Sequence, residues 1–189
     1  MPIEHFLAYH CGPAMAGIKP ANIASCVKTE NSDVLLSIKR LDNILQRRGI
    51  CIEILCECEE RYLIMVYRRK KLCEYLNSPQ IKALLTEFGY PYKFSLELYL
   101  DILKNKIKKV CARGEGFPHE IGAFLGYPAH DIYGFINHKN EGCMLTGEWK
   151  VYAEAEKAQK LFYRYSACRR AILKHLHGGK TLEELFCAA

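Results

Sequence analysis

Apolar residues recur three and four positions apart over residues 34–49, which is the spacing of an amphipathic helix. Asn31, Ser32 and Asp33 precede this stretch as candidate N-cap residues, and Gly49 suits its end. The apolar stripe consists of Leu35, Ile38, Leu41 and Leu45. The pattern predicts one helix that covers a core with this stripe.

From residue 50 the apolar period changes to two, which predicts a β-strand. Residues 62–67 form a second apolar run after a short turn at Glu59-Glu60, so the two runs predict a β-hairpin. One face of the first strand would carry Ile50, Ile52, Ile54, Cys56 and Cys58, and the other Cys51, Glu53, Leu55 and Glu57. On this reading Cys56 and Cys58 belong to the core and are not metal ligands.

The N-terminal run Phe6 to His10 is interpreted as a short strand that breaks at Gly12-Pro13, where Pro13 would begin a helix. Helices are expected at 70–77, 78–88, 94–111 and 153–177, with two short helices on either side of Gly126. Thr181 and Glu184 form a capping box for a last helix. The expected fold is α+β: a small N-terminal sheet, made of a short strand plus a β-hairpin, is covered by a helical majority. Residues 1–189 would form a single domain, with a strand, helix and hairpin part at 1–69 and a helical part at 70–189.

Composition changes this picture little. The chain has 189 residues, half of them hydrophobic and a quarter charged, which is ordinary for a globular protein. Neither a run of about 20 apolar residues nor a signal peptide is present, so we expect a cytoplasmic protein without a membrane span. Ten cysteines without any Cys-x-x-Cys spacing favour free thiols in a reducing compartment.

The formal net charge of +6 raises the question of whether the protein binds nucleic acid. The basic clusters fall where solvated helix faces are expected. The second of the two short helices, "AHDIYGFINHKN", has one lysine and a glycine, Gly134, in its middle, which is unsuited to a major-groove reader. Nucleic-acid binding is therefore disfavoured but stays open.

The segment "GFPHEIGAFLGYP" (116–128) places His119 beside Glu120. A zinc-protease helix needs a second histidine four positions after the first, and that place is Ala123. Any metal or acid–base role would therefore need partners from elsewhere, and the candidates are His10-Cys11 and Cys143. A metal site would combine Cys11, His119 and Cys143, since thiolate and imidazole suit soft transition metals. A catalytic site would instead use a Cys11 nucleophile and a His119 base. Cys11 has the alternative reading of a buried small residue.

Three stretches, "YHCGPAMAGIKPANIASC", "GFPHEIGAFLGYPAHDIYGFI" and "GEWKVYAEAEKAQKLFYRYSAC", resemble the uncharacterised bacterial family called domain of unknown function 3793. The resemblance implies single-domain cytoplasmic proteins of anaerobic bacteria and no established activity. The resemblance also implies cysteines on either side of the glycine before the tryptophan, but here Gly147 has Leu145, Thr146 and Glu148 as neighbours and only Cys143 nearby. The positions that match are His10, Cys11, Pro13, Gly17, Lys19, Asn22, Pro118, His119, Glu120, Gly122, Gly126, Tyr127, Pro128, Gly147, Trp149, Lys150, Val151 and Tyr152.

The leading hypothesis is a pocket lined by His10, Cys11, Lys19, His119 and Glu120 that binds a small molecule or metal in anaerobic redox or metal metabolism. Catalytic roles would fall to Cys11, to His119 and to Glu120 as the carboxylate that orients it. His10 and Lys19 would bind a cofactor whose identity is unknown, with Lys19 paired to an anionic group. A protein-interaction or regulatory module without catalysis is the competing reading, and a basic nucleic-acid binder comes third.

Overall fold

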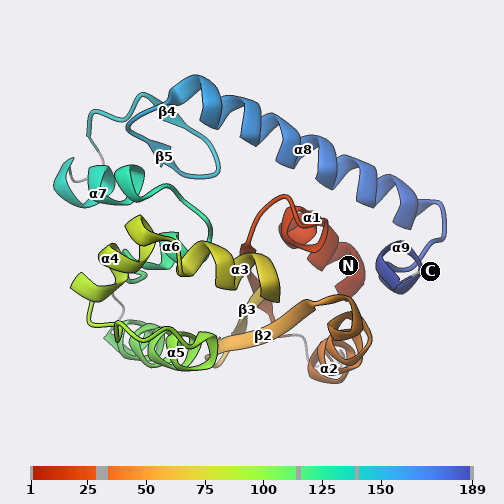
Figure 1. Ribbon diagram of the computed structural model, residues 1–189. Helices are drawn as coiled ribbons and strands as arrows, with labels where there is room; N and C mark the ends of the chain where they lie inside the picture. The colour runs from red at the N-terminus through yellow and green to blue at the C-terminus, as the bar shows by residue number, and fades with distance from the viewer. Residues whose placement is uncertain (1, 29–33, 114–115, 139–140, 188–189) are drawn as a thin grey trace. The chain divides into compact units, whose positions relative to one another are not determined.

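The computed structural model describes residues 2–28, 34–113, 116–138 and 141–187 (Figure 1). The expected N-cap residues Asn31, Ser32 and Asp33 lie outside them. The chain forms two compact units, which are named here the first unit (Met1–Leu72 with Tyr165–Ala189) and the second unit (Cys73–Arg164). Helices α3 (Arg69–Leu76) and α8 (Ala155–His177) begin in one unit and end in the other. The expected single domain, divided at residue 69, stays a prediction.

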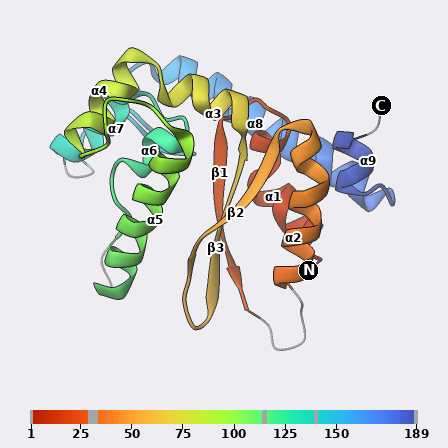
Figure 2. The ribbon, with the colours of Figure 1, turned by 60° about the horizontal axis from the view of Figure 1, so that its bottom comes forward.

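The first unit is an antiparallel three-stranded sheet in the order β1-β3-β2. One sheet face and the helices pack around a common core, as Figure 2 shows for α1 and α2. Ile64 in β3 pairs with Ala24 in β1 and Ile54 in β2 at the centre of this face. The elements are α1 (Ile3–Met15), β1 (Ala21–Val27), α2 (Val34–Leu45), the 3₁₀ turn η1 (Gln46–Arg48), β2 (Ile50–Glu57), β3 (Arg61–Arg68) and α9 (Leu182–Cys187). The α+β class is therefore confirmed.

The second unit is mainly helical and packs around aromatic rings. Tyr90 lies with its ring centroid 5.1 Å from that of Tyr99 and 5.8 Å from that of Phe124, and all three are buried. Such tilted and edge-to-face pairs are favourable beyond the area that they bury. The elements besides α3 and α8 are α4 (Pro79–Glu87), α5 (Leu96–Arg113), α6 (Ile121–Phe124), α7 (Ala129–His138), β4 (Leu145–Thr146) and β5 (Lys150–Val151).

The prediction of a strand at Phe6 to His10 is wrong, because these residues lie inside α1. Pro13 is in the last turn of that helix and not at the start of another. A residue before proline normally avoids helical backbone angles because its Cβ meets the proline ring, but Gly12 has no Cβ. The first strand is instead Ala21–Val27, and its Asn22 accepts a hydrogen bond from the Ala14 N–H (3.1 Å), which fixes the strand to α1.

The hairpin is confirmed, but its alternation is interrupted. The pairing passes from Ile54 opposite Ile64 to Cys56 opposite Leu63, so Leu55 is an extra residue in a β-bulge. A bulge reverses which face each later residue occupies, so Cys56 does not share the face of Ile54. Cys56 is buried as expected, whereas the expectation that Cys58 lies in the core is wrong, since Cys58 is exposed.

Candidate functional site

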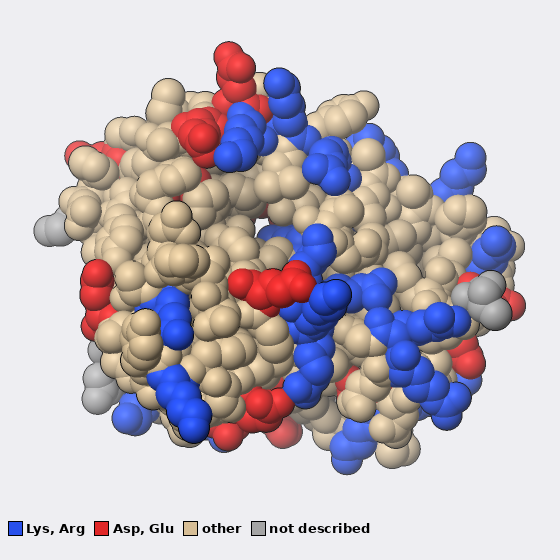
Figure 3. Space-filling model, in the orientation of Figure 1, with Lys and Arg blue, Asp and Glu red and all other residues tan. Residues whose placement is uncertain are grey.

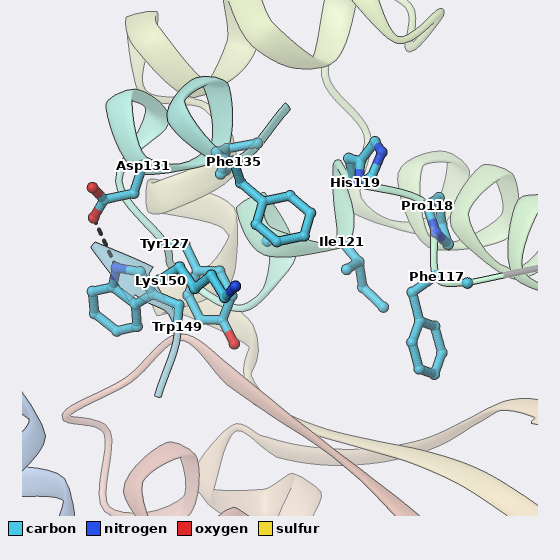
Figure 4. Close-up of a pocket in the computed structure, with 12 residues that line it drawn as sticks. Phe117, Pro118, His119, Ile121, Tyr127, Asp131, Phe135, Trp149 and Lys150 are labelled. Carbon is cyan, nitrogen blue, oxygen red and sulfur yellow. Dashed lines mark hydrogen bonds between the residues drawn. The ribbon is translucent and has the colours of Figure 1, made fainter. Parts of the chain in front are cut away.

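The second unit contains a pocket with a volume of about 470 Å³, walled mainly by apolar and aromatic side chains. Figure 4 shows the ring of Phe135 and the side chains of Ile121 and Phe117 around the same space as Tyr127 and Lys150. This volume falls within the range of small-molecule sites in proteins. The remaining lining residues are Gly116, Pro118, His119, Gly122, Asp131, Ile132 and Trp149.

Two short helices and the turn between them build one wall of the pocket. Gly126 ends α6 with a φ of 77°, a conformation that suits glycine, and the Tyr127 N–H donates to the Gly122 carbonyl (2.9 Å). A Cβ on Gly122 would lie 3.0 Å from Tyr127 Cδ2 and 3.1 Å from Ile132 Cγ1. The absence of a side chain at Gly122 therefore lets the two helices approach and bring Ile132 to the pocket.

The Asp131 carboxylate fixes the opposite wall. It is buried and accepts hydrogen bonds at 2.7 Å from the indole Nε1–H of Trp149 and from the Tyr152 N–H, and at 3.3 Å from the Ala153 N–H. His130 Nε2 lies 3.6 Å from the same carboxylate. A buried carboxylate needs such donors to offset its loss of hydration. Asp131 thus ties α7 to the segment around β5 and sets the position of the Trp149 ring.

Trp149 stacks on Tyr127 and presents that ring to the pocket. The two ring centroids are 4.8 Å apart with an interplanar angle of 28°, and Phe162 meets the indole edge-on at 4.6 Å. The Tyr127 hydroxyl donates to the Glu148 carbonyl (3.0 Å). Burial, with a smaller effect of Glu148, raises the pKa of Tyr127 to about 12. Tyr127 is therefore a neutral phenol at physiological pH, and the Trp149 ring that stacks on it is itself buried.

His119 and Glu120 point to different surroundings. His119 is exposed at the pocket, with its ring 5.5 Å from that of Phe135 in a T-shaped contact. Glu120 is buried, and its Oε1 accepts a hydrogen bond from Lys106 Nζ at 2.6 Å. The same ammonium donates to the Phe88 carbonyl (2.6 Å). The observed pairing of Glu120 is thus with Lys106, and its role of orienting His119 stays a prediction.

His10, Cys11 and Lys19 belong to the first unit. Cys11 is fully buried in the core, and burial raises the pKa of its thiol to about 12, against smaller opposing effects of Lys19 and Arg169. A thiol in this state is protonated at neutral pH, which favours the reading of Cys11 as a buried small residue. His10 is exposed on α1, and Lys19 is buried with its Nζ 5.5 Å from the centroid of the Tyr165 ring.

The pocket and the metal site predicted from the sequence each combine residues of both units, because His119, Glu120 and Cys143 belong to the second unit. Both stay predictions. Cys143 is half-buried and its Sγ lies 3.5 Å from Thr146 Oγ1. Within the part of the chain that the structure describes, no three His, Cys, Asp or Glu side chains are grouped so that they could hold a metal ion.

The face of the molecule shown in Figure 3 carries charges of both signs. On the face shown in Figure 3, Asp and Glu side chains lie among the more numerous Lys and Arg side chains. A site for the nucleic-acid backbone generally presents a continuous basic patch or stripe. Among the described residues, no helix combines the length and the apolar character that crossing a membrane requires.

A family described as "Protein of unknown function (DUF3793)" matches residues 7–186. The chain belongs to this family. The match confirms the resemblance inferred from the three sequence stretches, and its description assigns no activity. No curated protein and no solved structure matches the chain.

Sequence reasoning missed two of the pocket's main parts. Asp131 was not singled out, because an acidic residue in the first turn of a helix is common and needs no buried partner. Phe135 was not among the candidate site residues either, and it is half-buried and lines the pocket. Pro118, His119, Gly122, Tyr127, Trp149 and Lys150 all lie in the stretches that resemble the family. Their position in these stretches was the one sequence feature that could have indicated the pocket residues, although it could not show that they surround one cavity.

Proposed function

We propose that the pocket of the second unit binds a small organic molecule with an aromatic or other flat apolar body and an anionic group. The observation that carries the proposal is the pocket itself, whose volume of about 470 Å³ is enclosed mainly by apolar and aromatic side chains. Pockets of this composition bind ligands through apolar burial, and a few polar groups set the orientation.

The body of the ligand would lie against Phe135 and Tyr127, because both rings line the pocket and aromatic faces favour stacked or edge-on partners. Lys150 would attract the anionic group, since it is the one Lys or Arg among the described residues that line this pocket. His119, at the exposed side, would donate a further hydrogen bond. This assignment keeps His119 from the original site hypothesis and needs neither a thiolate nor a metal ion.

The setting of this binding, in the cytoplasm and in anaerobic redox or metal metabolism, is part of the same proposal. It is supported by ten cysteines, all of which the structure describes as free thiols. Abundant free thiols persist most readily in a reducing compartment.

Fluorescence of Trp149 tests the proposal directly, because the chain has one tryptophan and that residue lines the pocket. We expect naphthoate and the neutral naphthylmethanol to change this fluorescence saturably, and Phe135→Ala to weaken both. Lys150→Met should weaken naphthoate alone, by about tenfold, because it removes a charge-assisted contact and keeps the aliphatic stem. Lys108→Met, at an exposed position of α5, is the matched control and should change neither.

Absence of saturable binding of both compounds would overturn the proposal. Equal weakening of the charged and the neutral compound by Lys150→Met would refute the assignment of Lys150 to the anionic group. A response to Lys108→Met as large as that to Lys150→Met would show only a general effect of charge.

A further inference from the structure

A second, more polar groove lies in the first unit, between α1 and the part of α8 that follows Tyr165. The two helices lie side by side (Figures 1 and 2), and a Cβ on Gly12 would come within 3.0 Å of Ile172 Cδ1 and 3.7 Å of Arg169 Cγ. Gly12 therefore allows the close approach. The groove has a volume of about 290 Å³, and the residues that line it are Tyr9, His10, Ser166, Arg169, Arg170 and Leu173.

Helical spacing gathers the donors of this groove on one side of α8. Arg169 and Arg170 follow Ser166 by three and four positions, so each of them lies beside Ser166 on the surface of the helix. His10 meets them from α1. Its ring is held between Phe6, at a centroid distance of 4.6 Å, and Tyr9, which meets it edge-on at 4.9 Å.

The chemistry of the groove is that of an oxyanion receptor. Two guanidinium groups, a hydroxyl and an imidazole supply donors from two helices, and the described residues that line the groove include no carboxylate. A guanidinium matches phosphate oxygens with two parallel N–H donors, which makes arginine the preferred side chain for this group. Burial, and then the positive charge of Arg169, lower the pKa of His10. An anion placed between these groups would relieve that repulsion.

We propose that this groove binds a phosphoryl group, either as free phosphate or as the phosphate end of a small organic monoester. A phosphate dianion is tetrahedral and accepts hydrogen bonds from several directions, so it can contact the donors of both α1 and α8. Tyr9 is 54% exposed at the edge of the groove, and Leu173 lines it, so an organic substituent would meet an aromatic ring and an apolar side chain. The site is separate from the pocket of the second unit and does not depend on the function proposed for it.

Titration calorimetry of the full chain with inorganic phosphate and with phenyl phosphate, at constant ionic strength, tests the proposal. Arg169→Gln and Arg170→Gln should each weaken binding by about tenfold, because each removes one charge-assisted contact. Lys174→Gln removes a positive charge from an exposed position of the same helix outside the groove and should leave binding unchanged. Tighter binding of phenyl phosphate would identify a monoester as the ligand, and equal affinity would identify free phosphate; both outcomes support a phosphoryl site.

Proton NMR of the histidine side chains gives a readout that is independent of folding defects. The His10 signal is identified by its loss in His10→Gln, and phosphate should raise the pKa of His10 because an adjacent anion favours the charged imidazole. The rise should be smaller in Arg169→Gln. No saturable heat up to about 20 mM of either compound, a range that already covers weak binding, would overturn the proposal. So would an unchanged His10 pKa, or equal losses of affinity in Lys174→Gln and the arginine variants.

Discussion

Replacement of Asp131 by alanine should destabilise the second unit more than any loss of a surface carboxylate. The variant removes the acceptor of two hydrogen bonds of 2.7 Å and one of 3.3 Å, and it leaves the Trp149 indole N–H and the Tyr152 N–H without their acceptor. A hydrogen bond to a charged group contributes about 1.5–3 kcal/mol. The two short bonds alone therefore predict a loss of about 3–6 kcal/mol in the free energy of unfolding.

Urea denaturation followed by Trp149 fluorescence measures this loss, because the single tryptophan reports on the second unit. Such a loss is a large part of the roughly 5–15 kcal/mol that stabilises an ordinary domain. Asp131→Asn is the milder companion variant, because its amide keeps one acceptor oxygen, and it should lose about half as much. Asp101→Ala, at an exposed position of α5, is the matched control and should change stability by less than about 0.5 kcal/mol. A free energy of unfolding for Asp131→Ala within about 1 kcal/mol of that control would show that Asp131 does not hold the wall of the pocket.

Three further measurements address packing and thiol chemistry. Gly134→Ala would place a Cβ in steric overlap with Tyr152 Cγ, so it should destabilise the second unit by about 1–3 kcal/mol in urea titrations. Gly116→Ala, whose Cβ would meet nothing within 4 Å, is the control. Equal stabilities of the two variants would contradict the predicted clash. At pH 8 a disulfide reagent should label the exposed Cys58 rapidly and Cys11 only when the chain unfolds, because burial raises the pKa of the Cys11 thiol to about 12. Labelling of both cysteines at the same rate would contradict the burial of Cys11. Because the pKa of Cys11 is about 12 in the folded chain and 9.0 in the unfolded chain, the unfolded chain releases this proton at lower pH. The contribution of Cys11 to the free energy of unfolding is therefore full below pH 9.0 and declines as the pH rises towards about 12. Wild type should therefore lose more stability between pH 8 and pH 10 than Cys11→Ala, and parallel losses would refute the linkage.

Local chemistry made much of the fold predictable. The capping box forms as expected: the Glu184 N–H donates to Thr181 Oγ1 (3.2 Å) and the Thr181 N–H to Glu184 Oε2 (2.8 Å). Gly49 and Gly126 both adopt the positive φ that their positions after helices suggested. These features depend on a few neighbouring residues, so the sequence contains all the information that they need.

Prediction failed where a distant partner decided the outcome. The strand Ala21–Val27 is stabilised by pairing with β3, which lies about forty positions later in the chain. The apolar pattern of residues 21–27 alone was too weak to predict a strand there. The bulge at Leu55 likewise belongs to the pairing of β2 with β3 and not to either strand alone. Propensity is a weak guide when pairing and burial determine what a segment does.

The sequence alone determined the α+β class, most of the helices, the hairpin and the family, because each rests on local spacing or on matching stretches. It also singled out His119 as a candidate, since no packing or capping role explained that side chain. Only the tertiary structure decided that His119 lies beside Phe135 at an apolar pocket, that Glu120 pairs with Lys106, and that Asp131 holds Trp149. The physical reason is that burial and hydrogen bonding depend on which distant segments meet, and the spacing of residues within one segment does not contain that information.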